Sequence, residues 1–161
     1  MKILQVVGYQ NSGKTSLMVA LLKYFRRAGI KVATLKHHGH GGMPHGIEMK
    51  DSTLHHQAGA IVAGVEGEGV FQLVKEEPWK LEELINVYQL WEIDLLLIEG
   101  FKGAEFEKIV LLRDEKDRKL LGQITNVIAV VAPKELKHLL IDFKVFQPKE
   151  QLNLAEWLMT R

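Results

Sequence analysis

The sequence contains no cysteine, and its opposite charges nearly cancel to a formal net charge of +1. Without cysteine, the protein has neither a disulfide framework nor a metal site built from thiolates. The near-zero net charge provides no strong field for nucleic acid or an anionic membrane surface, and we expect neither as the main partner. The longest apolar runs have the length of strands, well below the roughly 18 residues that a membrane-spanning helix requires.

The remaining composition is that of an ordinary globular protein. Hydrophobic residues make up 47% of the 161 residues and charged residues 25%, which is typical of a soluble domain with a substantial core. This length predicts a single domain over residues 1–161. The N-terminus leads directly into a strand pattern and shows no signal-peptide pattern, so we expect a cytoplasmic protein.

One stretch near the N-terminus, GYQNSGKT at 8–15, matches the phosphate-binding loop pattern GxxxxGK[ST], the Walker A motif. Glycines at its two ends let the backbone curl so that N–H groups point at phosphate oxygens. Lys14 adds a mobile positive charge for the β- and γ-phosphates, and the Thr15 hydroxyl can bind Mg²⁺. The predicted phosphate-binding residues are Gly8, Gln10, Asn11, Ser12, Gly13, Lys14, Thr15 and Ser16.

The segments around this loop have the order that the motif requires. Residues 2–7 are rich in β-branched side chains, typical of a buried strand, and residues 17–28 repeat apolar side chains at helical spacing. Gly29 is a natural stop for that helix. A further strand over 30–36 completes a β–α–β unit, which predicts parallel strands and a right-handed crossover. This context predicts a nucleoside triphosphate site where the loop amides and the helix N-terminus face one anion.

The rest of the chain predicts an α/β fold. Strand patterns at 60–65 and 70–74 have a connection so short that only an antiparallel hairpin fits, so the central sheet is expected to be mixed. The charged run Asp114–Lys119 is interpreted as a solvated turn. Further strands are predicted at 94–100, 106–112 and 126–131, and helices at 51–58, 78–91 and from 149 onward. The expected class is a P-loop NTPase-like three-layer α/β fold with a mostly parallel, mixed central sheet and an antiparallel hairpin.

Two carboxylates flank the apolar strand pattern DLLLIE at 94–99. Ligands of open α/β sheets bind at the carboxyl ends of the strands. Because five residues of strand separate the two acids by roughly 16 Å, only Glu99 is predicted to reach a nucleotide, as a metal ligand and catalytic carboxylate. Asp is commoner than Glu at such a position, and the alternative is that Glu99 is a surface carboxylate at a strand end.

A histidine-rich loop follows the second strand, since six of the seven histidines lie between 37 and 56. The candidate substrate- or nucleotide-binding residues here are Lys36, His37, His38 and His40. The histidines suit a transition metal, hydrogen bonding to phosphate or substrate, or a solvated polar loop. Asp51 fits equally well as a helix cap or as a water-mediated Mg²⁺ ligand.

Four stretches together resemble one family: GYQNSGKTSL (8–17), LKHHGHG (35–41), KDS (50–52) with QAGA (57–60), and DLLLIEGFK (94–102). The sequence resembles the MobB family, the molybdopterin-guanine dinucleotide biosynthesis protein B, over nearly its whole length. The resemblance implies a protein that binds GTP and Mg²⁺ and has weak GTPase activity. It also implies a role assisting the guanylyltransferase (MobA) that attaches a guanosine nucleotide to molybdopterin.

The resemblance also implies a homodimer, with molybdopterin or molybdoenzymes as further partners. By position it assigns Gly13, Lys14 and Thr15 to phosphate and Mg²⁺, and Asp51 and Glu99 to the metal side. One departure is that the loop between His38 and Asp51 is poorer in acidic residues than in many relatives. The residues themselves carry no guanine signature, because the Asn-Lys-x-Asp sequence of many GTPases is absent.

Other functions fit the phosphate loop as well. A small-molecule kinase needs an Arg-rich helical lid, for which Arg113–Lys119 is the one candidate. A nickel-delivering accessory GTPase would store metal on the histidine loop, although the lack of cysteine weakens that alternative, and a binding module without turnover is the third. No arginine lies in the phosphate loop, the histidine loop or the EGFK stretch (99–102), so we expect slow hydrolysis.

Overall fold

The computed structural model describes residues 1–38, 54–55, 57–75 and 77–161. These residues belong to two compact units, one formed by Met1–Gly39 with Ile85–Arg161 and the other by His40–Leu84. His40, Asp51 and half of the helix predicted at 51–58 lie outside the described residues, although Leu54, His55 and Gln57 are helical. The single-domain organisation stays a prediction.

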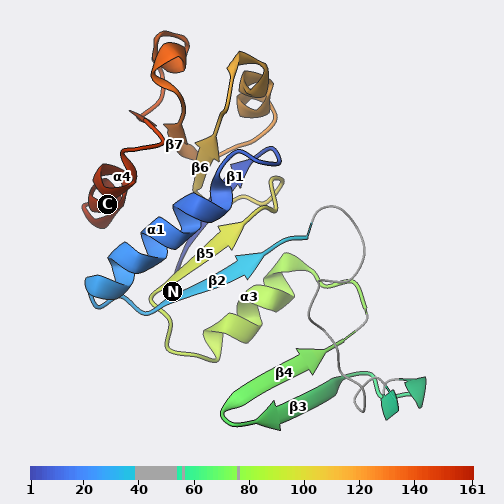
Figure 1. The fold of residues 1–161 in the computed structure, drawn as a ribbon. Coiled ribbons are helices and arrows are strands. Elements are labelled where there is room, and N and C mark those ends of the chain that lie inside the picture. Colours follow the sequence, from blue (N-terminus) through green and yellow to red (C-terminus); the bar gives the residue numbers. More distant parts are fainter. Residues whose placement is uncertain (39–53, 56, 76) are drawn as a thin grey trace. The chain divides into compact units, whose positions relative to one another are not determined.

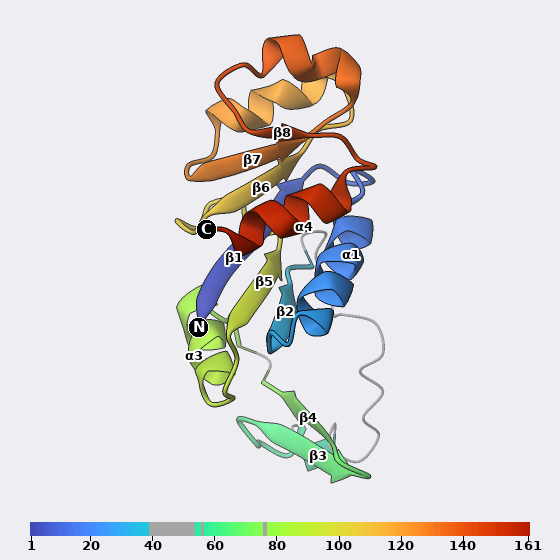
Figure 2. The same cartoon turned by 90° about the vertical axis from the view of Figure 1, so that its left-hand side faces the viewer.

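The first unit contains a six-stranded sheet in the order β2-β5-β1-β6-β7-β8 (Figures 1 and 2). Each adjacent pair of strands is parallel. The strands are β1 (Lys2–Gly8), β2 (Val32–Lys36), β5 (Leu95–Glu99), β6 (Lys108–Leu111), β7 (Val127–Val131) and β8 (Val145–Phe146). Strands β5 and β6 are buried along their whole length, as expected for the middle of a sheet covered on both faces.

Two helices cover one face of this sheet. Helix α1 (Lys14–Arg27) and helix α4 (Gln151–Met159) lie side by side on it (Figures 1 and 2). Their apolar side chains, including Leu21 and Leu154, join Val6 and Ile109 in one buried cluster. Helix α1 ends as its sequence predicts, because Gly29 adopts a φ of +79° just after the last turn.

The opposite face is covered by two 3₁₀ helices, η1 (Glu115–Gly122) and η2 (Lys134–Leu139). Leu120 and Leu136 from these helices join Val7 and Val110 in a second buried cluster. Neighbouring strand residues therefore point to opposite faces, as the period of a strand requires. The result is the three-layer arrangement expected from the sequence, with the phosphate loop at the carboxyl end of β1.

The second unit contains a hairpin of β3 (Ala63–Gly67) and β4 (Val70–Val74), which are antiparallel. Glu68 and Gly69 connect them with φ values of 50° and 78°, as in the two-residue turns typical of hairpins. This pair is a separate two-stranded sheet, so the prediction that it makes the central sheet mixed is wrong. Its strands pair with each other and are mostly exposed, unlike β5 and β6 of the large sheet.

Three further elements differ from their prediction. The helix expected from Pro78 is α3 (Leu81–Gln89), and the two-residue strand β8 was not predicted because it is too short to show a period. The segment interpreted as a solvated turn is η1, capped by Asp114, whose side chain accepts from the Lys116 N–H at 2.9 Å. That interpretation is wrong for Asp117, which is only 3% exposed.

Candidate phosphate-binding site

The loop between β1 and α1 is shaped by left-handed backbone positions. Asn11 has a φ of 58° and Gly13, the N-cap of α1, a φ of 88°. A side chain at Gly8 would not fit, because a Cβ there would lie 2.5 Å from Ser12 Oγ and 2.9 Å from Leu111 O. The first turn of α1 contains no acidic residue, and its N-cap Gly13 makes no side-chain capping bond to the first N–H groups. The N-terminus of α1 therefore remains suited to an anion.

Lys14 is the half-buried cation of this loop. Its Nζ donates to the carbonyl of Tyr9 at 2.7 Å. Burial lowers the pKa of Lys14, and the positive charges of Lys102, Lys36 and Arg113 lower it further, while Glu99 acts in the opposite direction. Four cations and one carboxylate thus share the electrostatic environment of the loop, which favours binding of an anion.

Glu99 ends β5, the neighbour of β1, and is only 8% exposed. The Thr15 hydroxyl donates to Glu99 Oε2 at 3.4 Å, longer than a usual hydrogen bond between two oxygens. Lys36 Nζ lies 3.5 Å from Glu99 Oε1. The structure therefore brings together Thr15, Glu99 and Lys36, three residues that the sequence predicts for this site. Asp94 lies at the far end of the same strand, where its carboxylate accepts from the Lys31 N–H at 2.8 Å.

His37 lies beside the same strand end. Its backbone N–H donates to the Glu99 carbonyl at 2.9 Å, and its imidazole ring contacts the ring of Phe101 with 4.5 Å between centroids. A Cβ on Gly100 would lie 3.0 Å from the His37 Cβ. His38 follows in an exposed position, whereas His40 and Asp51 lie outside the described residues.

The donor set fits Mg²⁺ better than a transition metal. Magnesium is held through one or two carboxylates together with waters and substrate phosphates, and Thr15 with Glu99 offers such a partial set. Among the residues that the structure describes, no group of three or more His, Cys, Asp or Glu could hold a metal ion. The described part of the histidine loop therefore gives no support to a nickel store.

The sequence of this chain matches one known protein family. The sequence model of the MobB family, described as molybdopterin guanine dinucleotide synthesis protein B, matches residues 3–133. The chain belongs to the MobB family. A probable molybdopterin-guanine dinucleotide biosynthesis adapter protein of Bacillus subtilis (strain 168) is 46% identical over 134 residues, 83% of this chain and 77% of the relative. The molybdopterin-guanine dinucleotide biosynthesis adapter protein of Haemophilus influenzae (strain ATCC 51907 / DSM 11121 / KW20 / Rd) is 30% identical over 144 residues. The match covers 87% of this chain and 80% of the relative.

Solved MobB structures share the fold. The crystal structure of Bacillus subtilis MobB superposes with a TM-score of 0.82 at 37% identity, over 99% of this chain and 97% of that chain. The X-ray structure of a MobB homologue from Bacillus stearothermophilus gives a TM-score of 0.76 at 32% identity, with the same coverage. The predicted MobB resemblance and α/β fold class are confirmed, and so is the place of this chain in molybdopterin guanine dinucleotide biosynthesis. None of the helices in the described part of this MobB chain has the length and apolarity needed to cross a membrane.

Two buried polar side chains that the sequence patterns do not reveal hold the segment after Glu99. Gln5 is fully buried in β1, and its Nε2 donates to Gly100 O at 2.9 Å and Phe101 O at 2.8 Å. Lys108 is fully buried in β6, and its Nζ donates to the carbonyls of Ala104 and Phe106. The available signal was a long polar side chain inside an otherwise apolar strand, which must find buried partners.

Arg113 also lies at the phosphate loop, a position that its place in the sequence does not predict. Its Nη1 donates to Gln10 O at 3.2 Å, and its guanidinium pairs with Asp117 at 2.9 Å. The segment Arg113–Lys119, considered as a kinase lid, leads into Leu120, which is packed in the core. A segment anchored in this way does not support the kinase alternative. The signal for the pair was the i,i+4 spacing of opposite charges.

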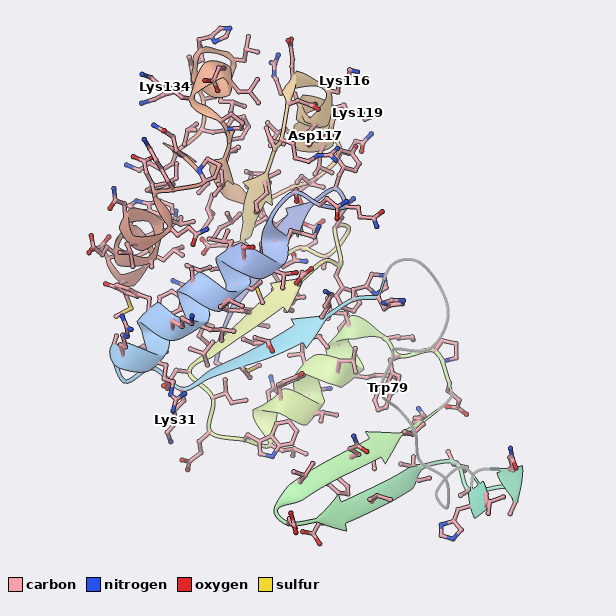
Figure 3. The ribbon with its side chains drawn as sticks, viewed as in Figure 1. Lys31, Trp79, Lys116, Asp117, Lys119 and Lys134 are labelled. Carbon is pink, nitrogen blue, oxygen red and sulfur yellow. The ribbon has the colours of Figure 1, made fainter. Side chains whose placement is uncertain are left out.

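Basic side chains also gather around Tyr9. Lys102 Nζ lies 4.6 Å and Lys119 Nζ 5.7 Å from the centroid of the Tyr9 ring. Figure 3 labels Lys119 and Asp117 on η1. The two lysines come from the segments after β5 and β6, the two strands that flank β1. The edge of the sheet around the phosphate loop is therefore lined from both sides by cations.

Proposed function

We propose that this chain is a GTP- and Mg²⁺-binding adapter in molybdopterin guanine dinucleotide biosynthesis that assists the guanylyltransferase (MobA) of that pathway. The observation that carries the proposal is the meeting of Lys14 and Thr15 from the phosphate loop with Glu99 from the neighbouring strand. Guanine is preferred to adenine because of the family to which the chain belongs. The word adapter comes from the relatives, which carry it in their names.

In this proposal the loop amides and Lys14 bind the phosphate chain of the nucleotide. The phosphate-contacting residues are Gly8, Gln10, Asn11, Ser12, Gly13, Lys14, Thr15 and Ser16. The Lys14 ammonium, which donates to the Tyr9 carbonyl, would exchange that carbonyl for phosphate oxygens. Such an exchange replaces a neutral acceptor by charged ones, which make stronger hydrogen bonds.

Thr15 and Glu99 would hold Mg²⁺, which supplies positive charge at the phosphate oxygens when bound. Glu99 additionally orients the attacking water, the basis of its proposed catalytic role and of a weak GTPase activity. Lys36, which lies beside Glu99, compensates the carboxylate charge before the metal binds. Asp51 is proposed as a further water-mediated metal ligand.

The wider setting of the proposal rests on the family. We propose a cytoplasmic homodimer in which residues 1–161 act as one nucleotide-binding domain. Its partners are MobA and molybdopterin or the molybdoenzymes that receive the finished cofactor. The loop with His37, His38 and His40 is proposed to contact nucleotide or cofactor. The hydrogen bond from the His37 backbone N–H to the Glu99 carbonyl places the start of this loop beside Glu99 and supports that role.

A nucleotide-binding screen of the purified chain tests this function. GTP, GDP, ATP and ADP are compared with and without Mg²⁺, and each is repeated with molybdopterin and the transferase present. We expect the tightest binding for GTP with Mg²⁺, and an effect of the chain on guanylyl transfer. Equal or tighter binding of ATP would reject the guanine assignment. Absence of any nucleotide binding would reject the proposed function as a whole.

A further inference from the structure

The phosphate loop has a second flank that the proposed function does not use. Strand β1 pairs with β5 on one side and with β6 on the other, where Gly8 is the register partner of Leu111. Glu99 belongs to the β5 side, and Arg113 follows two residues after the end of β6. Arg113 Nη1 donates to Gln10 O at 3.2 Å, so the guanidinium lies against the loop itself.

The guanidinium is fixed by a buried carboxylate. Asp117 Oδ2 accepts from Arg113 Nε at 2.9 Å and from the Arg113 backbone N–H at 3.0 Å, and Oδ1 accepts from Nη2 at 3.0 Å. The Asp117 side chain is 4% exposed, whereas that of Arg113 is 45% exposed. A bidentate pair of this kind sets both the direction and the rotation of the guanidinium. One end is therefore immobilised while the other faces solvent beside the loop.

Unused donors remain on the exposed end. A guanidinium has five N–H donors, and the bonds to Asp117 and Gln10 use one each on Nε, Nη1 and Nη2. Two N–H groups, one on Nη1 and one on Nη2, are thus not engaged by these bonds. An arginine oriented in advance loses less rotamer entropy when it binds phosphate oxygens.

The position of Arg113 relative to Lys14 indicates which phosphate it would meet. Lys14 Nζ donates to Tyr9 O and Arg113 Nη1 to Gln10 O, the carbonyls of two consecutive loop residues. The lysine of this loop type serves the β- and γ-phosphates. The charge of Arg113 is also among those that lower the pKa of Lys14, so the two cations are close enough to interact.

We propose that Arg113 contacts the terminal phosphate of a bound nucleoside triphosphate from within the same chain, and that Asp117 is its positioning residue. This inference rests on the proposed function, because it requires a nucleotide in the loop. It makes the site selective for triphosphate over diphosphate, since the terminal phosphate alone reaches the arginine. It also gives the site a cation where charge develops during phosphoryl transfer.

The competing explanation is that Arg113 only stabilises the loop conformation, through its hydrogen bond to the Gln10 carbonyl. Such stabilisation would support the loop for every nucleotide, so its loss would weaken diphosphate and triphosphate binding by the same factor. A contact to the terminal phosphate would weaken triphosphate binding alone. The ratio of the two affinities therefore separates the explanations.

The test measures dissociation constants of the full chain for GDP, for GTP, and for GDP with aluminium fluoride, all with Mg²⁺. Arg113→Gln is the main variant, and Arg118→Gln, on the 3₁₀ helix η1 that follows Arg113, removes the same charge as a matched control. For Arg113→Gln we expect GTP and the fluoride complex to bind about ten- to a hundredfold more weakly, with GDP within about twofold. Arg118→Gln should match the wild type.

Two further variants keep the test independent of folding defects. Arg113→Lys retains the charge but loses the bidentate pair, and Asp117→Asn leaves the guanidinium without its ionic partner. Both should lower the preference for GTP over GDP while circular dichroism shows a folded chain. Equal losses for GDP and GTP, or no loss in Arg113→Gln, would overturn the inference and leave the proposed function standing. A wild type that binds neither nucleotide would overturn both.

Discussion

Lys14 holds its ammonium against its own loop rather than in open solvent. The Nζ atom donates to Tyr9 O at 2.7 Å, and burial is the largest cause of the lowered pKa of this side chain. Desolvation and three neighbouring positive charges act against the charged form of Lys14, and the Glu99 carboxylate acts in its favour. This cluster of positive charge at the phosphate loop favours binding of an anion.

Lys14→Ala should abolish binding of Mg²⁺–nucleotide with little effect on folding. At a nucleotide concentration about a hundredfold above the dissociation constant, the wild type should gain about 2.7 kcal/mol of stability. Thermal unfolding with and without GTP measures the gain, which should vanish in the variant. Lys23→Ala, on the exposed side of α1, is the matched control and should behave like the wild type. An equal gain in Lys14→Ala would contradict the assignment of the phosphate loop.

Glu99 and Asp94 form a matched pair of carboxylates at the two ends of β5. Glu99→Gln should slow GTP hydrolysis at least about tenfold. Nucleotide binding should weaken only modestly, because Lys14 and the loop amides still hold the phosphates. Stability without nucleotide should change by less than about 1 kcal/mol, since the Lys36 partner of Glu99 is 61% exposed. Single-turnover kinetics measure the hydrolysis rate. Thermal unfolding without and with GTP measures the stability and the nucleotide binding.

Asp94→Asn is the control for Glu99→Gln and should leave hydrolysis and nucleotide binding nearly unchanged. Its carboxylate caps the Lys31 N–H at 2.8 Å, and an amide oxygen can accept the same bond. A larger loss of turnover in Asp94→Asn than in Glu99→Gln would mean that the nucleotide binds at the opposite end of the sheet.

At the scale of elements, the ion pair of Asp117 with Arg113 ties η1 to the segment that follows β6, and the apolar contacts of Leu120 pack η1 against the sheet. The hydrogen bond from the Arg113 side chain is the main reason that the pKa of Asp117 lies below its usual range. A carboxylate with a lowered pKa in the folded state contributes stability above its unfolded value of about 3.9. That contribution disappears as the pH falls through the folded pKa.

Asp117→Asn should therefore destabilise the protein by about 1–3 kcal/mol at neutral pH. The difference from the wild type should shrink below about pH 4, as the wild-type carboxyl becomes protonated. Urea unfolding between about pH 3 and pH 7 measures this change, and Glu115→Gln, exposed on the same helix, is the control. A difference that is independent of pH would show that the ion pair does not stabilise η1.

Strand β1 and the segment after β5 are joined by Gln5, which donates to two carbonyls of residues nearly a hundred positions away. Gln5→Leu keeps the approximate size of the side chain and leaves Gly100 O and Phe101 O without these donors. We expect a loss of about 1–3 kcal/mol of stability in urea unfolding, whereas Gln89→Leu at the exposed end of α3 should cost little. If both variants unfold alike, the two carbonyls are satisfied in another way.

These elements show what sequence patterns can predict. The strand–loop–helix unit around Lys14 is local, and the strand ending at Glu99 shows a continuous apolar run, so both were correctly predicted. Arg113 and Gln5 act through partners set by strand order, which no local period shows. The exposed hairpin and β8 lack the buried runs that indicate membership of a sheet.

At the scale of the whole molecule, strand order explains why the site is where it is. Strand β1 lies between β5 and β6, so the loop that follows it receives side chains from both neighbours at the carboxyl edge of the sheet. Glu99 comes from one neighbour and Arg113 from the segment after the other. The parallel arrangement thus assembles the predicted phosphate site from three separate parts of the sequence.

The last prediction is the intrinsic turnover of the isolated chain. The absence of arginine from the three site stretches of the sequence predicts slow hydrolysis, but Arg113 reaches the loop from outside them. An arginine in the same chain does not by itself make hydrolysis fast, since G-protein α subunits with one turn over at about 10⁻² s⁻¹. We therefore still expect the purified protein to hydrolyse GTP well below about 1 s⁻¹ in single-turnover measurements, and Arg113→Gln to be slower again. A rapid rate without any partner would contradict an adapter that holds its nucleotide, and would require a water-activating group beyond Glu99.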